Sequence, residues 1–409
     1  MERSVADRAE KDGRRLIFFA PDLTDGSTIK RVQDFIDYGY RITVFGFRRQ
    51  RYNRDYNPPW SYVSLGATSD GRYWHRIWAL LKAIPIVIKN RRRLRRASVF
   101  YARNIDQLIL ALIGRLVACG RVTLAYEVLD IPPILTGRKP ASILLRMIER
   151  WCLRHVRLLV LSSPGFHRNY YLPTQGYRRE WFLLENKLHP SALNHLSGER
   201  RMRGDGADER GPYQWVVGYF GLIRGEATFD LMTRVAARLQ DRVLFKFRGI
   251  LTTVDEEKFF AALKRSRNMV YEGPYLAPRD LPSLYRQVDF AWALDLEHAD
   301  HNSRWLLPCR FYEAGLHGVP CLAVQGFEIG ALIERLGVGW TFDGLLEEAI
   351  VRFFETLTRA AYQEKCQRLL SLPIATFVSG DDVTELCRIL EGRPRPVGNL
   401  PIQPIAKAG

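Results

Sequence analysis

Short apolar runs alternate with helix-like segments from the start of the chain. Residues 16–20 (LIFFA) form an apolar run that ends at Pro21, and a polar loop then leads into a helix-like stretch from residue 29. A second apolar run, residues 41–47, follows Gly39. A strand, a loop, a helix and a second strand in this order predict the opening of a parallel α/β domain.

The same alternation continues on both sides of a polar break. The other strands predicted before the break are residues 99–102, 122–126 and 158–162, with helices at 106–119 and 142–155. Those predicted after it are residues 215–220, 243–248, 270–271, 290–293 and 321–324, with helices at 229–239 and 256–266. The break itself, residues 197–212, is charged and glycine-rich without a hydrophobic period, which is typical of a linker or loop.

This pattern divides the 409 residues into two α/β domains with polar ends, as the length also favours. We expect a mobile leader at 1–13, a first domain at 14–196, a linker or loop at 197–212, a second domain at 213–392 and a loose, proline-containing tail at 393–409. Ligands of open α/β sheets bind outside the carboxyl ends of the strands, and domain interfaces are preferred pocket positions.

The charge of the chain is uneven. Residues 1–200 carry 35 Lys and Arg against 17 Asp and Glu, whereas residues 201–409 carry 26 against 27. We therefore expect the first domain to face an anionic partner. Nucleic acid is not expected, because no RNP, helix-turn-helix or zinc-finger signature is present. The six cysteines show no CxxC spacing, which predicts scattered free thiols in a reducing compartment.

One basic, aromatic segment, residues 72–96, is a candidate for contact with a membrane surface. Its aromatic and apolar positions 74, 78 and 81 recur at helical spacing, and a cluster of arginines follows. The membrane-binding candidates are Trp74, Trp78, Arg91, Arg92 and Arg93. The alternative is a core helix with a solvated end, which Pro85 favours because we expect it to break the amphipathic face. With no signal peptide and no spanning run of about 18 apolar residues, we expect a cytoplasmic protein on the inner face of the plasma membrane.

A glycine loop follows the first strand of the second domain. The sequence Gly218-Tyr-Phe-Gly221-Leu-Ile-Arg224-Gly225 opens toward a predicted helix. Glycine lets a backbone approach a phosphate closely, and the helix N-terminus carries a partial positive charge. Arg224 is suited to a bidentate contact with a diphosphate. The alternative is an ordinary turn with a surface arginine.

A second candidate segment lies at residues 308–320, PCRFYEAGLHGVP. Arg310 and Glu313 are three residues apart, so they share one face of a helix that we expect to end at Gly318. A carboxylate near the start of a helix can accept two hydroxyl hydrogen bonds from a ribose, and Arg310 offers positive charge for a diphosphate. The alternative is a surface Arg–Glu pair, which contributes little stability.

These segments, taken with others in the same order, resemble the GT-B glycosyltransferases. The match is nearest to bacterial exopolysaccharide transferases of the succinoglycan-biosynthesis type and extends over about residues 15–390. It rests on seven segments, residues 125–131, 161–166, 185–187, 218–224, 272–275, 284–289 and 308–320. The resemblance implies an α/β, GT-B-like fold in which two Rossmann-like domains face each other across a cleft. The first would lie on the acceptor side, and the second would bind a nucleotide sugar.

The resemblance also implies an activity. We expect a hexosyltransferase of exopolysaccharide biosynthesis that moves a sugar from a nucleotide-diphosphate donor, most simply a UDP-sugar, to a lipid-diphosphate-linked glycan. Its donor-binding residues would be Gly221, Arg224, Arg310 and Glu313. No cofactor is expected: there is no DxD motif in a strand-end position, and the His298, Asp300 and His301 loop has irregular ligand spacing.

One departure from the family bears on the mechanism. A retaining branch carries a second carboxylate eight residues before Glu313, where this chain has Trp305. An inverting mechanism is therefore favoured, and it needs a general base on the acceptor side. Asp130 is the first candidate, Asp25 the second, and Glu127 also follows a predicted strand. A retaining transferase, and a non-catalytic GT-B-like protein that binds glycan or lipid in a polysaccharide assembly complex, remain alternatives.

Overall fold

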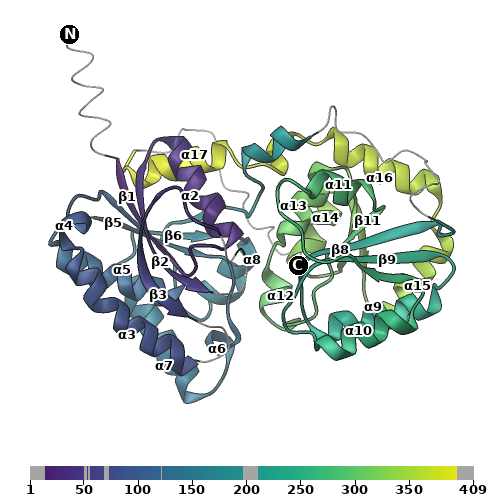
Figure 1. The fold of residues 1–409 in the computed structure, drawn as a ribbon, viewed down its shortest axis with the longest axis horizontal. Coiled ribbons are helices and arrows are strands. Elements are labelled where there is room, and N and C mark those ends of the chain that lie inside the picture. The colour runs from purple at the N-terminus through teal and green to yellow at the C-terminus, as the bar shows by residue number, and fades with distance from the viewer. Residues whose placement is uncertain are drawn as a thin grey trace, which may run out of the picture. The chain divides into compact units, whose positions relative to one another are not determined.

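The computed structural model describes residues 14–49, 53, 56–68, 73–120, 122–196 and 211–393. They form two compact units, each with helices packed around one sheet (Figure 1). The first unit comprises residues up to Glu185 and those from Asp381 onward, and the second comprises Asn186–Gly380. This division places the boundary before the expected linker and assigns the last helix to the first unit. The leader, residues 197–210 of the linker and the tail from residue 394 lie outside the described residues.

The sheet of the first unit has seven strands in the order β3-β2-β1-β4-β5-β6-β7, and all its neighbouring strands are parallel. Its strands are β1 (Arg15–Ala20), β2 (Arg41–Arg49), β3 (Ser61–Thr68), β4 (Val99–Arg103), β5 (Thr123–Val128), β6 (Leu158–Leu161) and β7 (Trp181–Leu183). The central strands are buried on both faces, which is why they read as continuous apolar runs. The edge strand β3 is largely exposed and has a weaker apolar signal, so the sequence did not reveal it.

Helices cover both faces of this sheet. They are α2 (Gly26–Tyr38), α3 (Tyr73–Lys89), α4 (Arg91–Leu94), α5 (Ile105–Ala118), α6 (Pro133–Thr136), α7 (Pro140–Leu153), α8 (Pro164–Phe166) and α17 (Asp381–Leu390), and a π-helical turn at His167–Tyr171 follows α8. A 3-10 turn at Pro190–His195 already belongs to the second unit. Helix α5 packs against both α3 and α7, whereas α17 packs against α2 (Figure 1). Right-handed crossovers explain this arrangement. From β1 the chain passes through α2 toward one edge of the sheet, and from β4 it passes through α5 and α7 toward the other edge. Right-handed connections in opposite directions place α2 on one face of the sheet and α5 and α7 on the other.

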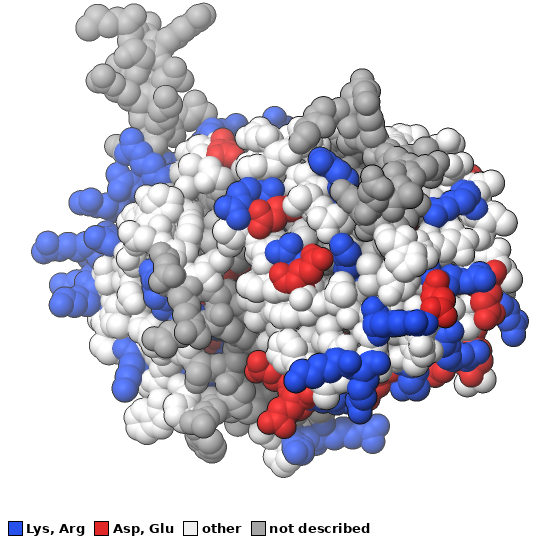
Figure 2. Space-filling view, turned by 45° about the vertical axis from the view of Figure 1, so that its right-hand side comes forward, with Lys and Arg blue, Asp and Glu red and all other residues white. Residues whose placement is uncertain are grey.

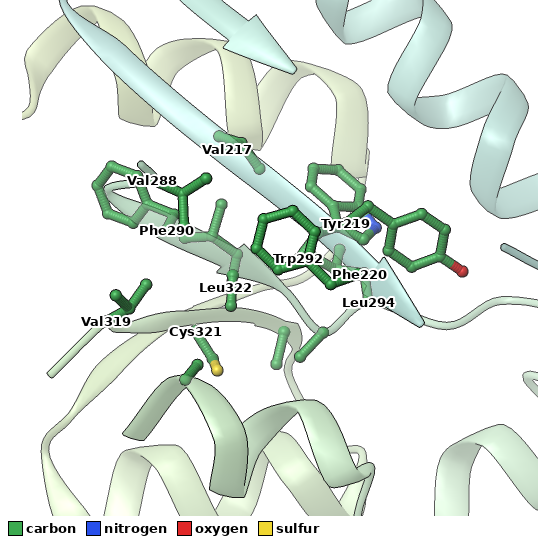
Figure 3. Close-up of a cluster of buried hydrophobic side chains, with 14 of the residues drawn as sticks. Val217, Tyr219, Phe220, Val288, Phe290, Trp292, Leu294, Val319, Cys321 and Leu322 are labelled. Atoms are coloured by element: carbon green, nitrogen blue, oxygen red, sulfur yellow. The ribbon is translucent and has the colours of Figure 1, made fainter. Parts of the chain in front are cut away.

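The second unit contains six parallel strands in the order β10-β9-β8-β11-β12-β13. Its strands are β8 (Trp215–Ile223), β9 (Val243–Leu251), β10 (Met269–Tyr271), β11 (Phe290–Trp292), β12 (Cys321–Val324) and β13 (Gly339–Phe342). Its helices are α9 (Glu226–Arg238), α10 (Glu256–Arg265), α11 (Leu281–Arg286), α12 (Asn302–Trp305), α13 (Cys309–Leu316), α14 (Glu328–Leu336), α15 (Leu346–Thr356) and α16 (Arg359–Ser371), followed by a 3-10 turn at Ile374–Thr376. Val217, Phe290, Trp292 and Leu322 belong to the core around its central strands (Figure 3).

Helix α3 corrects one prediction. It runs without interruption from Tyr73 to Lys89 and contains Pro85. Proline removes a hydrogen bond to the carbonyl four residues earlier, but Pro85 lies on the exposed side, where water can bond that carbonyl. The expected break is therefore absent, and the apolar periodicity continues along one helix.

Candidate functional site

The predicted donor residues of the second unit come from β8, the segment after it, and α13. Gly221 lies near the carboxyl end of β8, and Arg224 directly follows that strand. Arg310 and Glu313 are the second and fifth residues of α13, which begins after Pro308. A Cβ atom added to Gly221 would lie 3.9 Å from Arg310 Nη2, so the glycine loop and the helix lie close together.

The guanidinium of Arg310 is held by the ends of two neighbouring strands. Its Nε donates to the carbonyl of Phe220 at 2.8 Å, and its Nη1 donates to the carbonyl of Trp292 at 2.7 Å. The group also lies over the Tyr219 ring, 4.3 Å from its centroid. Nη2 has no hydrogen-bond partner among the described residues, which leaves one cationic N–H edge for a ligand oxygen. The planar guanidinium of Arg310 therefore makes both carbonyl contacts from fixed positions and still presents one N–H edge.

Two glycines allow β8 and β9 to approach closely beside Arg310. Gly221 has a φ of 103° and Gly249 a φ of 134°, values that favour glycine. A Cβ atom on Gly249 would lie 1.8 Å from the carbonyl oxygen of Gly221. A side chain at Gly249 would therefore displace the strand end that carries the Arg310 contacts.

The Glu313 carboxylate is supported from α11. The hydroxyl of Tyr285 donates to Glu313 Oε2 at 3.1 Å, and the Tyr285 ring stacks on His317 with a centroid separation of 5.4 Å. Burial, followed by the charge of Glu313, raises the pKa of Tyr285 well above its usual value, so its hydroxyl remains a donor. Tyr275 experiences the same two effects, and its pKa is also raised.

Arg224 forms ion pairs that the sequence did not reveal. Its Nη2 lies 2.6 Å and its Nε 3.0 Å from Asp295 Oδ2, and Nε lies 3.4 Å from a Glu297 carboxylate oxygen. Burial disfavours ionisation of Asp295, but the Arg224 charge and hydrogen bonds outweigh it and lower the pKa of Asp295. The only available signal was the position of these acids just after a predicted strand. A diphosphate contact by Arg224 remains a prediction.

The two predicted bases lie in segments that follow β1 and β5. Asp25 is half-buried and is the N-cap of α2, where its carboxylate accepts from the Thr28 N–H at 3.2 Å and from the Ser27 hydroxyl. Asp130 is exposed and precedes Pro132, the N-cap residue of the short helix α6. Strands β1 and β5 are separated only by β4, so their carboxyl ends are about 10 Å apart along the same edge.

Glu127, the third carboxylate considered, is a structural ion-pair partner. It is 1% exposed, its Oε1 accepts from Arg31 Nε at 3.0 Å, and its Oε2 accepts from Arg103 Nε at 2.8 Å. Burial opposes ionisation, but the two guanidinium groups overcome it and lower the pKa of Glu127. A buried carboxylate bound in this way cannot reach an acceptor hydroxyl.

Asp22 is a buried carboxylate that sequence analysis overlooked. It lies after β1 and accepts from the N–H and the hydroxyl of Thr24 at 3.0 and 2.9 Å. Burial raises its pKa despite these hydrogen bonds. Its contacts, which include the Arg49 N–H at 3.4 Å, hold the loop that carries Asp25.

The histidine loop after β11 shows a local polar contact, with His301 Nδ1 2.7 Å from Asp300 Oδ1. Within the described ranges, no three His, Cys, Asp or Glu side chains converge as metal ligands.

Most of the predicted membrane-binding side chains belong to the described part of the chain. Trp78 is 63% exposed on α3, so the core-helix alternative does not apply to it. Arg91, Arg92 and Arg93 are exposed in α4, whereas the Trp74 side chain lies outside the described residues. Lys and Arg side chains gather at the left edge of Figure 2 with few acids beside them. Over the described part of the chain, no helix combines the length and apolarity needed to cross a bilayer.

The chain resembles known proteins in sequence and in fold. No protein-family model matches the chain. It is 29% identical over 357 residues to the succinoglycan biosynthesis protein ExoL of Rhizobium meliloti (strain 1021), with 87% of each chain covered. The structure of Anabaena HepE in complex with UDP-glucose superposes with a TM-score of 0.65 at 14% identity, covering 92% of this chain and 99% of HepE. WaaG, a glycosyltransferase involved in lipopolysaccharide biosynthesis, gives 0.61 at 12% identity, covering 92% and 100%.

These similarities agree with the two parallel Rossmann-like sheets. The predicted GT-B-like fold class and the relationship to succinoglycan-type proteins are confirmed.

Proposed function

We propose that this chain, which has the GT-B fold and is a distant homologue of ExoL, transfers a sugar from a nucleotide-diphosphate donor to a glycan acceptor. The observation that carries the proposal is the fixed Arg310 guanidinium. Two backbone carbonyls orient it, and its remaining N–H edge can bind a diphosphate at the carboxyl ends of β8 and β11.

Glu313 completes the donor site in this proposal. Its carboxylate lies one helical turn after Arg310, where it can accept hydrogen bonds from the ribose hydroxyls. A UDP-hexose is the proposed donor, since the similar HepE structure is a complex with UDP-glucose. Arg310, with Arg224 beside the same strand end, would stabilise the departing nucleotide diphosphate.

The proposed acceptor is a lipid-diphosphate-linked oligosaccharide of exopolysaccharide biosynthesis. The relationship to ExoL supports the pathway class, and the basic first unit supports an anionic, membrane-borne acceptor. In this proposal the protein binds peripherally to the inner face of the plasma membrane through residues 72–96.

The proposed reaction inverts the anomeric centre. Asp130 removes the proton from the acceptor hydroxyl as the new glycosidic bond forms and the bond to the nucleotide diphosphate breaks. Trp305 supports this choice, because it stands where a retaining branch has a carboxylate. Asp25 is the second candidate base, although its N-cap hydrogen bonds also give it a structural role.

Titration calorimetry of the full chain with UDP-glucose, GDP-mannose and dTDP-glucose tests donor binding. We expect one donor to bind to wild type. Arg310→Lys should lower transfer turnover, because a lysine ammonium lacks the planar fork that orients the free N–H edge of Arg310. The absence of binding to every donor would contradict the proposal. Donor binding with no transfer to any lipid-linked acceptor would favour the alternative, a non-catalytic binding protein. The observation behind that alternative is Trp305, which stands where a retaining branch has a second carboxylate besides Glu313.

A further inference from the structure

Three helices on one face of the first sheet expose apolar side chains outward. On α3, Trp78, Leu81 and Ile88 recur at helical spacing and are exposed, whereas Ala83 and Val87 of the same helix are buried. The helix is thus apolar on two sides, and only one side contributes to the core.

Helix α7 repeats this arrangement, which residues 72–96 alone did not indicate. Ile143, Leu144, Met147 and Trp151 follow one helical stripe, and each is about half exposed or more, with Met147 at 60%. The opposite side of α7 buries Glu149, Cys152 and Leu153. Between the two helices, α5 packs against both and ends near Leu116, which is 76% exposed.

The charge around these apolar stripes is almost entirely positive. Residues 73–157 contain 17 Lys and Arg against four Asp and Glu. Two of the four acids, Glu127 and Glu149, are buried. On the exposed side of α7, Arg150 and Arg154 flank the stripe, while Lys82 and Lys89 accompany that of α3.

We propose that the α3–α5–α7 face is a docking surface for an anionic lipid bilayer, with α7 as a second membrane-contacting helix beside α3. A bilayer of acidic lipids matches this face in two ways. Trp78, Met147 and Trp151 can insert into its apolar acyl region, and its phosphate groups attract the surrounding cations. Tryptophan suits the boundary between acyl chains and headgroups, because its ring is apolar and its N–H is polar. The inference rests on the proposed function only in that a lipid-linked acceptor brings the enzyme to such a surface.

Vesicle co-sedimentation of the full chain tests the surface. The α7 variant is Leu144→Gln with Met147→Gln, and the matched control is Leu345→Gln, a 75% exposed leucine of the second unit. We expect the α7 variant to partition about tenfold or more weakly to phosphatidylcholine vesicles containing phosphatidylglycerol, with an unchanged melting temperature. The control should partition like wild type, and vesicles of phosphatidylcholine alone should bind all three proteins weakly.

Equal partitioning of the α7 variant and wild type would overturn the proposal. It would also be overturned if the variant bound vesicles like wild type but had a lower mass than wild type in analytical ultracentrifugation without lipid. The α7 side chains would then form an interface between copies of the chain. UDP-glucose titration of the same proteins separates this inference from the transferase. A wild type that binds vesicles through α7 but binds no nucleotide sugar would retain the surface and lose the proposed reaction.

Discussion

The Tyr285 hydroxyl donates to Glu313 Oε2 at 3.1 Å and so fixes one carboxylate oxygen from a neighbouring helix. Tyr285 is buried and stacks on His317, which restricts its own movement. The arrangement gives Glu313 a defined orientation before any ligand arrives, and such preorganisation lowers the cost of binding.

We predict that Glu313→Ala raises the dissociation constant of the donor by about tenfold or more, through the loss of charge-assisted hydrogen bonds. Tyr285→Phe should raise it by about fivefold, since the carboxylate remains but one neutral donor to it is lost. Titration calorimetry with UDP-glucose measures both. Unchanged donor affinity in a folded Glu313→Ala protein would remove Glu313 from the donor site.

The Arg224–Asp295 pair predicts a stability effect that can be separated from catalysis. Arg224→Ala leaves Asp295, which is 8% exposed, without its main counter-charge. Because Arg224 itself is partly exposed, we expect a loss of about 1–3 kcal/mol in the free energy of unfolding.

Adding Asp295→Asn to Arg224→Ala should restore part of that stability, because the unpaired charge is removed. If Arg224 also contacts the diphosphate, the double variant should still turn over slowly. Recovery of turnover together with stability would assign Arg224 a structural role only.

The sequence predicted the positions of strands and strand ends better than it predicted which charged side chains form ion pairs. Arg310 and Glu313 were predicted to share one helical face because they are three residues apart, and both lie in α13. Asp295 pairs with Arg224 across 71 positions of sequence, and no local pattern carries that information.

Periodicity had a similar limit on α3. The spacing of positions 74, 78 and 81 predicted a helix, which α3 confirms, but it did not indicate whether the apolar stripe faced the core or solvent. The packing of Ala83 and Val87 decides this, because it turns Trp78 outward. Likewise, Asp25 follows a strand as a catalytic acid would, yet a helix start also favours aspartate as its N-cap.

The buried Glu127 pair predicts an acid-sensitive contribution to stability. Glu127→Gln should lower the free energy of unfolding by about 3–5 kcal/mol at neutral pH, because two buried guanidinium groups lose their shared counter-charge. The pKa of Glu127 is below its usual 4.5 in the folded state. Its stabilisation is therefore present above about pH 4.5 and lost as the pH falls, so the difference from wild type should shrink in acid.

Glu149→Gln provides the matched contrast. Glu149 is equally buried but is held by neutral donors such as Tyr170 and Gln175, and burial raises its pKa. Its stabilisation is present at low pH and lost as the pH rises through the folded pKa, so the trend should have the opposite sign. Urea unfolding of both variants across this range is the measurement, and parallel trends would contradict the assignment.

The α4 arginines should contribute to membrane binding by charge. Replacing Arg91, Arg92 and Arg93 with Gln should weaken partitioning to anionic vesicles by roughly a hundredfold at low salt, at about 1 kcal/mol for each cation. The difference should narrow as salt is added. A triple Gln variant of the exposed Arg265, Arg286 and Arg335 in the second unit is the charge-matched control. Similar losses in both variants would indicate a general effect of net charge rather than a binding surface.

The base of the proposed inverting reaction can be assigned by two conservative variants. Asp130→Asn removes the basic oxygen and keeps the shape, so donor affinity should persist while turnover falls by roughly 10²–10⁴-fold. Asp25→Asn is an informative partner, because asparagine also caps helices well and α2 should remain intact. Transfer rates and UDP-glucose affinity should be measured for each protein at the same donor saturation. Near-normal turnover in Asp130→Asn beside an inactive, folded Asp25→Asn would move the role to Asp25, and full activity in both would rule out a single-base mechanism built on either residue.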